Sequence, residues 1–179
     1  MRNSAHAPAQ RVDPACDVAH GRGSPPVRSR TLVAVFDSPV ARFLLKFASD
    51  TGFAAVLVEP GLAGEPPEAD GFTLARSLDG YAGATADVVV TDHHRPELGP
   101  VLAQALALHP RWVGVMGNPR HPAPHVPALA ALGVPPADIA RVHRPIGLNI
   151  GSRTPAEIAL ATLAGLIADR NGRPGGFVF

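Results

Sequence analysis

Four short apolar runs alternate along the chain with segments that carry helix-start signals, and this alternation constrains the fold more than any other feature. Each run is continuous and of strand length, which is typical of strands buried on both faces of a parallel sheet. Parallel strands need crossover connections, which are usually helices. We therefore predict an α/β fold, with a doubly wound, mostly parallel sheet and helices on both faces. The runs are TLVAVF at 31–36, FAAVLVEP at 53–60, ADVVVTD at 86–92 and RWVGVMG at 111–117.

The first connection carries clear helix boundaries. Asp37 or Ser38 can cap a helix, and Pro39 suits its first turn. Gly52 can end this helix. Strand, helix and strand then form a crossover unit, and the segment after Glu59, which contains prolines and glycines, is predicted to be a loop. Further helices are predicted over residues 96–108, 125–133, 136–142 and 154–172.

The last of these helices has the best-defined start. Thr154 and Glu157 form a capping box around Pro155. Within residues 158–168 only Thr162 is polar, so the helix is apolar on nearly every side. Its outer side needs either a dimer partner or neighbouring elements of the same chain, and a homodimer is therefore one expectation.

Length and composition predict one folded domain after an unstructured leader. A chain of 179 residues has room for one ordinary domain. Residues 1–30 lack helical or alternating apolar periodicity, so we predict a disordered leader there and a folded domain over residues 31–179. No apolar run reaches the ~18 to 20 residues that span a bilayer, and no secretory signal is present. We expect a soluble, cytoplasmic protein.

Charge, aromatic content and cysteine usage exclude several functions. The formal net charge is +1 and aromatic residues make up 5% of the chain, so neither the electrostatic nor the stacking surface of a nucleic-acid binder is expected. The single cysteine, Cys16, excludes an intrachain disulfide and a multi-thiolate metal cluster built by one chain.

Candidate ligand-binding residues follow each of the predicted strands. In open parallel sheets, ligands bind outside the carboxyl ends of the strands, near the point where strand order reverses. We therefore expect these polar residues to meet at one edge of the sheet. They are Asp37 and Ser38, Glu59, then Asp92, His93 and His94, and finally Gly117, Asn118 and Arg120.

The turn after the first strand argues against ordinary dinucleotide binding. Such a site needs glycines there, so that the backbone can approach a pyrophosphate. Asp37 instead places a carboxylate where phosphate would lie, and Phe36 and Pro39 crowd the turn. Glu59 does stand where an acidic residue would hold ribose hydroxyls, although a solvated acid at a strand end explains it equally well.

The histidines offer acid–base or ligating groups but no predicted metal site. Because His93 and His94 are adjacent, they point in opposite directions in an extended segment and can share a site only across a turn. His121 and His125 have helical spacing, but two intervening prolines prevent that helix. We predict no metal centre from these residues.

The loop before the last helix, IGLNIGSRT, could bind an anion or could only turn the chain. Gly151, Ser152 and Arg153 present N–H groups at a helix start, which suits an anion. The capping box already occupies two of these donors, and on spacing alone the simple turn is favoured.

Three segments together resemble the C-terminal Rossmann-like domain of the XdhC/CoxI family of xanthine dehydrogenase accessory proteins. They are VVVTDHH, GVMGNPRH and the long segment from 129 to 172, in which PIGLNIGSRTPAEIA is the most specific part. The resemblance is close over residues 88–172. It departs from the family at the first turn, where the family has glycines and this chain has Phe36, Asp37, Ser38 and Pro39.

This resemblance implies a role in molybdenum enzyme maturation. Family members are thought to hold molybdenum cofactor (molybdopterin) and deliver it to a molybdenum hydroxylase-type apoenzyme. The leading hypothesis is therefore an accessory protein without catalysis of its own, in which Arg120, Ser152 and Arg153 contact the ligand's phosphate. The alternatives are a small NAD(P)-dependent oxidoreductase, suggested by fold analogy, and a ligand-free scaffold that oligomerises through its last helix.

Overall fold

The computed structural model describes residues 14–22, 30–63, 71–118 and 120–176. The predicted leader is described only at residues 14–22 and at Arg30, and the rest of that prediction lies outside the described residues. Within it lies α1 (Pro14–Ala19), a short helix that the sequence did not predict.

Six parallel strands form one sheet, in the order β3-β2-β1-β4-β5-β6. This is the strand order of a doubly wound Rossmann fold, so the predicted fold class is confirmed. The order reverses between β1 and β4, which pair with each other although β2 and β3 separate them in the sequence. The strands are β1 (Thr31–Val35), β2 (Ala54–Val58), β3 (Thr73–Ala75), β4 (Ala86–Val90), β5 (Trp112–Val115) and β6 (Val142–His143).

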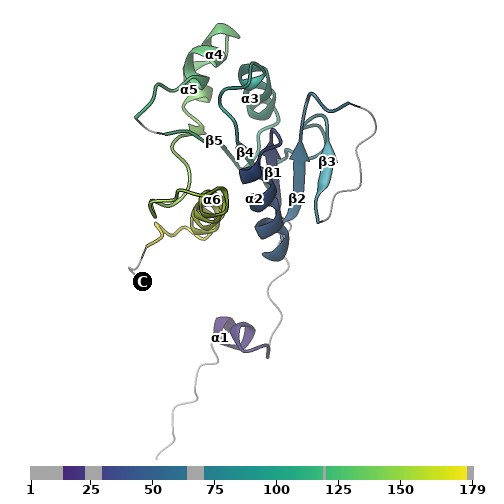
Figure 1. Ribbon diagram of the computed structural model, residues 1–179, viewed down its shortest axis with the longest axis vertical. Coiled ribbons are helices and arrows are strands. Elements are labelled where there is room, and N and C mark those ends of the chain that lie inside the picture. The colour runs from purple at the N-terminus through teal and green to yellow at the C-terminus, as the bar shows by residue number, and fades with distance from the viewer. Residues whose placement is uncertain (1–13, 23–29, 64–70, 119, 177–179) are drawn as a thin grey trace, which may run out of the picture.

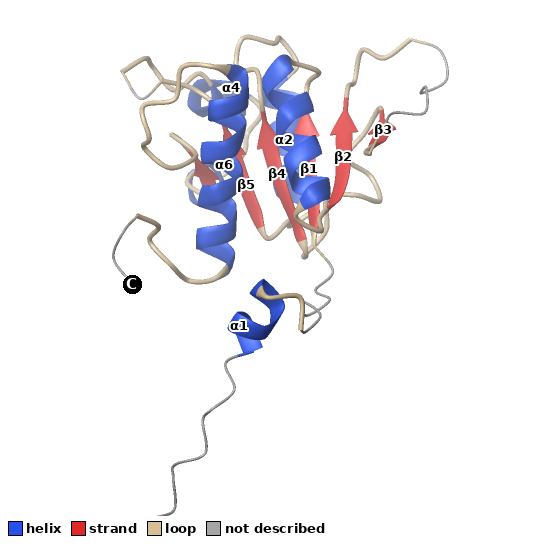
Figure 2. Cartoon of the chain, turned by 60° about the horizontal axis from the view of Figure 1, so that its bottom comes forward, coloured by secondary structure: helices blue, strands red, loops and turns tan. Residues whose placement is uncertain are grey.

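Helices cover both faces of the sheet (Figures 1 and 2). On one face α2 and α6 lie side by side, and on the other α3 packs against α4. Successive strand residues alternate between these layers, as β-strand geometry requires. In β1, Leu32 and Ala34 join the core under α2 and α6, whereas Val33 packs with the opposite layer. The helices are α2 (Pro39–Asp50), α3 (Leu98–Ala107), α4 (His125–Ala131), α5 (Pro136–Ile139) and α6 (Pro155–Arg170).

The predicted helix starts are confirmed at α2 and α6. Ser38 caps α2, where its Oγ accepts a hydrogen bond from the N–H of Ala41 at 3.0 Å. Both halves of the capping box at Thr154 and Glu157 are present at α6. No helix in the described ranges is both long and apolar enough to cross a membrane.

Two short edge strands differ from the predictions. β3 lies in the segment predicted to be a loop, where its three residues pair with β2. The helix predicted over residues 136–142 ends at Ile139, and Val142 instead pairs with Val113 as part of β6. Val142 is buried in the core, so tertiary pairing with β5 decides its conformation.

A buried cluster of ion pairs lies at the amino ends of the strands, opposite their carboxyl ends. Asp87 in β4 is fully buried, and its two oxygens accept from the Nε atoms of Arg111 and Arg170, each at 2.6 Å. Arg111 also pairs with Asp169 near the end of α6. The cluster therefore joins β4, the segment before β5 and the C-terminal end of α6.

Candidate functional site

Thr91 joins the two strands between which the strand order reverses. Its Oγ1 lies 2.9 Å from the carbonyl oxygen of Val35 and 2.8 Å from that of Phe36, and donates to this pair. The same oxygen accepts from Oγ of Ser38 at 3.1 Å. The carboxyl ends of β1 and β4 are thereby held together, and the polar residues that follow them lie at one edge of the sheet, as the sequence predicts.

The turn after β1 is closed by its own side chains. Phe36 is fully buried and has a φ of 71°, a left-handed conformation that is uncommon for a residue other than glycine. Asp37 pairs with Arg42 of α2, whose Nε lies 2.8 Å from the carboxylate. This ion pair raises the pKa of Arg42. The turn therefore presents a paired carboxylate instead of free N–H groups.

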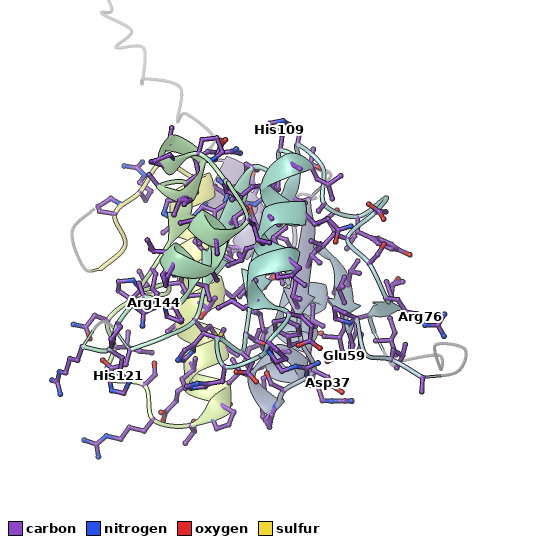
Figure 3. All side chains as sticks on the ribbon, turned by 90° about the horizontal axis from the view of Figure 1, so that it is seen from above. Asp37, Glu59, Arg76, His109, His121 and Arg144 are labelled. Carbon is purple, nitrogen blue, oxygen red and sulfur yellow. The ribbon has the colours of Figure 1, made fainter. Side chains whose placement is uncertain are left out.

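Glu59 is also engaged within the protein. One carboxylate oxygen accepts from the N–H of Asp37 at 2.9 Å, and the other accepts from the guanidinium of Arg95 at 2.9 Å. The Arg95 guanidinium lies over the ring of Phe36, 4.7 Å from its centroid. Both carboxylate oxygens of Glu59, the residue that would bind ribose hydroxyls, are therefore already hydrogen-bonded within the protein. Figure 3 shows Asp37 beside Glu59.

The segment after β4 turns and brings two histidines together. The N–H of His94 donates to Oδ1 of Asp92 at 2.9 Å, which is an Asx turn. The ring centroids of His93 and His94 consequently lie 4.0 Å apart. The opposed orientation expected for an extended segment does not occur, because the strand ends at Val90 and the chain turns before the histidines.

Arg144, directly after β6, holds the loop that follows β5. It donates from one terminal nitrogen to the carbonyl oxygen of Asn118 at 2.9 Å and from the other to that of His121 at 3.2 Å. Its guanidinium lies against the backbone of Gly117, where a Cβ would be 2.6 Å from Nε of Arg144. A glycine is therefore required at position 117 for this contact. Figure 3 shows Arg144 and His121 at the same end of the sheet.

Two of the nearby imidazoles are shifted toward their neutral form. Burial lowers the pKa of His93, and the positive charges of His94, Arg144 and His121 lower it further, against an opposing effect of Asp92. Burial and the charge of Arg144 lower the pKa of His125, the first residue of α4. The permanent charge of Arg144 therefore lies close to His93 and His125 and lowers the pKa of both.

The N-terminus of α6 is already occupied by a carboxylate. Oε2 of Glu157 accepts from the N–H groups of Arg153 at 2.7 Å and Thr154 at 3.1 Å. These bonds lower the pKa of Glu157. Ser152 donates from Oγ to the carbonyl oxygen of Glu157 at 3.3 Å. The backbone N–H groups predicted to bind an anion here are thus bonded to the carboxylate of Glu157, whose negative charge would repel an anion.

The glycines of the IGLNIG segment serve different purposes. Gly147 has a φ of 83°, and a Cβ there would lie 3.0 Å from the backbone nitrogen of Thr162 in α6. The next residue, Leu148, donates from its N–H to the carbonyl oxygen of Ala161 at 3.0 Å. Gly151 has a φ of 71° but open space around it. The segment therefore packs its backbone against α6, which accounts for its first glycine without a ligand.

The predicted site residues fall into three groups in the structure. Hydrogen bonds link the β1–β2 group with the β4 loop through Thr91 and Arg95. His121 lies in the loop after β5, and Arg144, which the sequence analysis did not assign to a ligand site, is hydrogen-bonded to that loop. Within the described chain, no hydrogen bond or ion pair joins residues 151–154 to either of the other groups. The groups are Asp37, Ser38 and Glu59; Asp92, His93, His94, Gly117, Asn118 and the exposed Arg120; and Gly151, Ser152 and Arg153.

Among the residues whose positions are described, no three His, Cys, Asp or Glu side chains are grouped so that they could hold a metal ion. The guanidinium of Arg144 and the nearby imidazoles can donate hydrogen bonds to an anion, whereas the carboxylate of Asp92 at the same strand ends opposes one.

We expect the protein to lose stability as the pH falls through the range in which free histidine titrates. The folded-state pKa of His125 is lowered, so the unfolded chain binds a proton before the folded chain does. The stability that neutral His125 contributes is complete above the ordinary histidine pKa of about 6.5. It is lost as the pH falls toward the lower pKa of His125 in the folded protein. Urea denaturation at about pH 7.5 and about pH 5.5 measures this change, and His125→Gln should remove up to about 1 kcal/mol of the difference. An equal pH dependence in both proteins would contradict it.

Comparisons with known proteins agree with this fold. The family model described as the XdhC Rossmann domain matches residues 32–166. The uncharacterized protein YqeB of Escherichia coli is 33% identical over 91 residues, which are 51% of this chain and 16% of YqeB. A crystal structure of a xanthine dehydrogenase from Bacillus halodurans superposes with a TM-score of 0.61 and 22% identity, over 81% of this chain and 44% of the other. The chain therefore corresponds to less than half the length of either relative.

Proposed function

Because the chain belongs to the XdhC family through its Rossmann domain, we propose that it is an accessory protein in the maturation of a molybdenum-cofactor enzyme. The partner we propose is an apoenzyme of the xanthine dehydrogenase or carbon monoxide dehydrogenase type. The family assignment carries this proposal. The chain matches less than half the length of each of the two relatives. The partner enzyme is therefore proposed for this domain and is not taken over from those proteins.

We propose that the ligand is a phosphorylated, pterin-like or nucleotide-like molecule bound at the carboxyl edge of the sheet. Molybdenum cofactor is the candidate that the family suggests, and its phosphate supplies the anion. Arg144 lies at this edge, and within the described residues its guanidinium donates to two backbone carbonyl oxygens and to no carboxylate, so its charge fits a phosphate group. The imidazoles of His93 and His94 lie within the same region and can donate further hydrogen bonds.

An NAD(P)-dependent oxidoreductase is the weaker alternative. A dinucleotide would need the turn after β1 for its pyrophosphate and Glu59 for its ribose. Phe36 and the Asp37–Arg42 pair occupy that turn, and Glu59 is bonded to Arg95. Both features oppose a dinucleotide in its usual position.

A ligand-free scaffold that forms a homodimer is the second candidate function. Leu160 on α6 is 53% exposed and Phe43 on the adjoining α2 is 42% exposed, so both helices present apolar side chains outward. Such side chains on neighbouring helices are compatible with a second copy of the chain.

Titrations of the purified chain separate these functions. We expect saturable, micromolar binding of released molybdenum cofactor and no saturable binding of NADH or NADPH, because the turn after β1 has no glycine and carries the carboxylate of Asp37 where a pyrophosphate would lie. Tight NADH binding would favour the oxidoreductase. Absence of binding by all three ligands, together with a dimer in analytical ultracentrifugation, would favour the scaffold.

A further inference from the structure

Five nitrogen-bearing side chains gather where β4, β5 and β6 end. Arg144 comes from the end of β6, two histidines come from the β4 loop, and two more come from the β5–α4 connection and the start of α4. Their charges act on one another, since Arg144 lowers the pKa of both His93 and His125, and His121 lowers that of His93. The group, called here the imidazole cluster, consists of His93, His94, His121, His125 and Arg144.

Among the residues that the structure describes, no carboxylate forms an ion pair with Arg144. Its terminal nitrogens donate to backbone carbonyls, and its buried Nε has no acceptor in the described part of the chain. Arg111 and Arg170, at the opposite edge, share the carboxylate of Asp87. A partly buried guanidinium is normally placed against a carboxylate or another anion, so Arg144 is a cation whose counter-charge is missing from the described residues.

His125 supplies a second unsatisfied group. Its side chain is 4% exposed, and its Nδ1 is buried without a hydrogen-bond partner among the described residues. The only charge acting on it in the described chain is that of Arg144. A buried imidazole next to a cation stays neutral, but an arriving anion would reverse that balance and favour its protonated form.

We propose that the imidazole cluster binds a phosphate-type dianion and that His93 and His125 take up protons from solvent when it binds. This inference rests on the proposed function and specifies the chemistry of its ligand site. Arg144 provides the fixed charge, and the imidazoles provide charge only while the anion is present. The groups that face His93 are His94 and Asp92 on its own loop, His121 from the β5–α4 connection and Arg144 from β6. Asp92 favours the protonated form, and the others oppose it until the anion offsets their charge.

The proton uptake makes anion binding tighter at lower pH. Each proton taken up changes the affinity by about tenfold per pH unit, between the histidine pKa values of the free and bound protein. Sulfate is the suitable probe because it stays doubly charged throughout this range, so any pH dependence belongs to the protein. A phosphate monoester and inorganic phosphate, measured in parallel, distinguish recognition of an organic ligand from recognition of the anion alone.

The test is isothermal titration of the full chain with sulfate near pH 6 and near pH 8, in two buffers with different ionisation enthalpies. We expect saturable binding of one sulfate, at least about tenfold tighter at the lower pH, with uptake of between one and two protons. Binding that is equally tight at both pH values without proton uptake would overturn the proposal, and so would the absence of saturable binding.

Two variants locate the anion. Arg144→Gln should weaken sulfate binding at least about tenfold, because it removes the charged donor. Gly117→Ala should weaken it too without removing a charge, because the added Cβ displaces the guanidinium. The matched control is Arg76→Gln, an exposed arginine at the far end of the sheet beside β3, which should bind as the unmodified chain does (Figure 3). Equal losses in Arg76→Gln and Arg144→Gln would overturn the assignment.

The same titrations separate this proposal from the proposed function. Proton-coupled sulfate binding without binding of molybdenum cofactor would support the anion site and contradict the accessory role. Cofactor binding that Arg144→Gln leaves unchanged would support the accessory role and contradict the anion site.

Discussion

Replacing Asp87 with alanine is expected to lower the free energy of unfolding by about 3–5 kcal/mol, which is the largest single-residue effect we predict. The carboxylate is fully buried, and it is bonded to two guanidinium groups that are 26% and 15% exposed. Its removal leaves Arg170 partly buried without a carboxylate partner and leaves Arg111 with only the exposed Asp169, and it removes the ion pairs that join β4 to the end of α6. Urea denaturation monitored by circular dichroism measures the loss.

Asp169→Ala is the matched control for this prediction. Asp169 pairs with the same Arg111, but its side chain is 47% exposed. Its removal should cost less than about 1 kcal/mol, as is usual for exposed ion pairs. Similar losses in the two variants would show that burial of Asp87 does not determine the strength of the cluster.

Replacing Gly147 with alanine should destabilise the fold by about 2–4 kcal/mol, whereas the same change at Gly151 should cost only about 1–2 kcal/mol. Both glycines have positive φ, so the backbone penalty is shared. Only at Gly147 would the new Cβ meet the backbone of α6, within 3.0 Å of the nitrogen of Thr162. The difference between the two variants therefore measures the close packing of the loop on α6.

Thermal and urea denaturation of both variants test this interpretation. A larger loss at Gly151 than at Gly147 would mean that the first part of the loop does not depend on contact with α6. A ligand role for Gly151 would then need to be considered again, since open space surrounds it.

Local signals predicted most of the fold. Apolar runs located β1, β2, β4 and β5, because strands buried on both faces need continuous apolar sequence. The capping box located the start of α6 at Pro155, because its hydrogen bonds form between residues three positions apart. β6 was missed because its two residues are held by pairing with β5, which no local pattern reveals.

The candidate site was predictable only in part, for the same reason. Strand ends predicted that Glu59 and His93 lie at the same side of the sheet, and the structure places both after the carboxyl ends of their strands. The hydrogen bond from Arg95 to the carboxylate of Glu59 was not predicted, because the two residues are 36 positions apart in the sequence. Arg144 was missed because it follows an unrecognised strand, and no motif marks its contact with the loop after β5. Tertiary partners of this kind decide which side chains at the strand ends are already hydrogen-bonded.

We propose that the chain holds a phosphorylated pterin-like ligand at the ends of β4, β5 and β6. Native mass spectrometry of the chain, purified from cells that make molybdenum cofactor, detects such a ligand directly. We expect a bound small molecule with the mass of a pterin phosphate, retained by Arg76→Gln and lost from Arg144→Gln. A chain that carries a dinucleotide, or a pterin that Arg144→Gln retains in full, would contradict it.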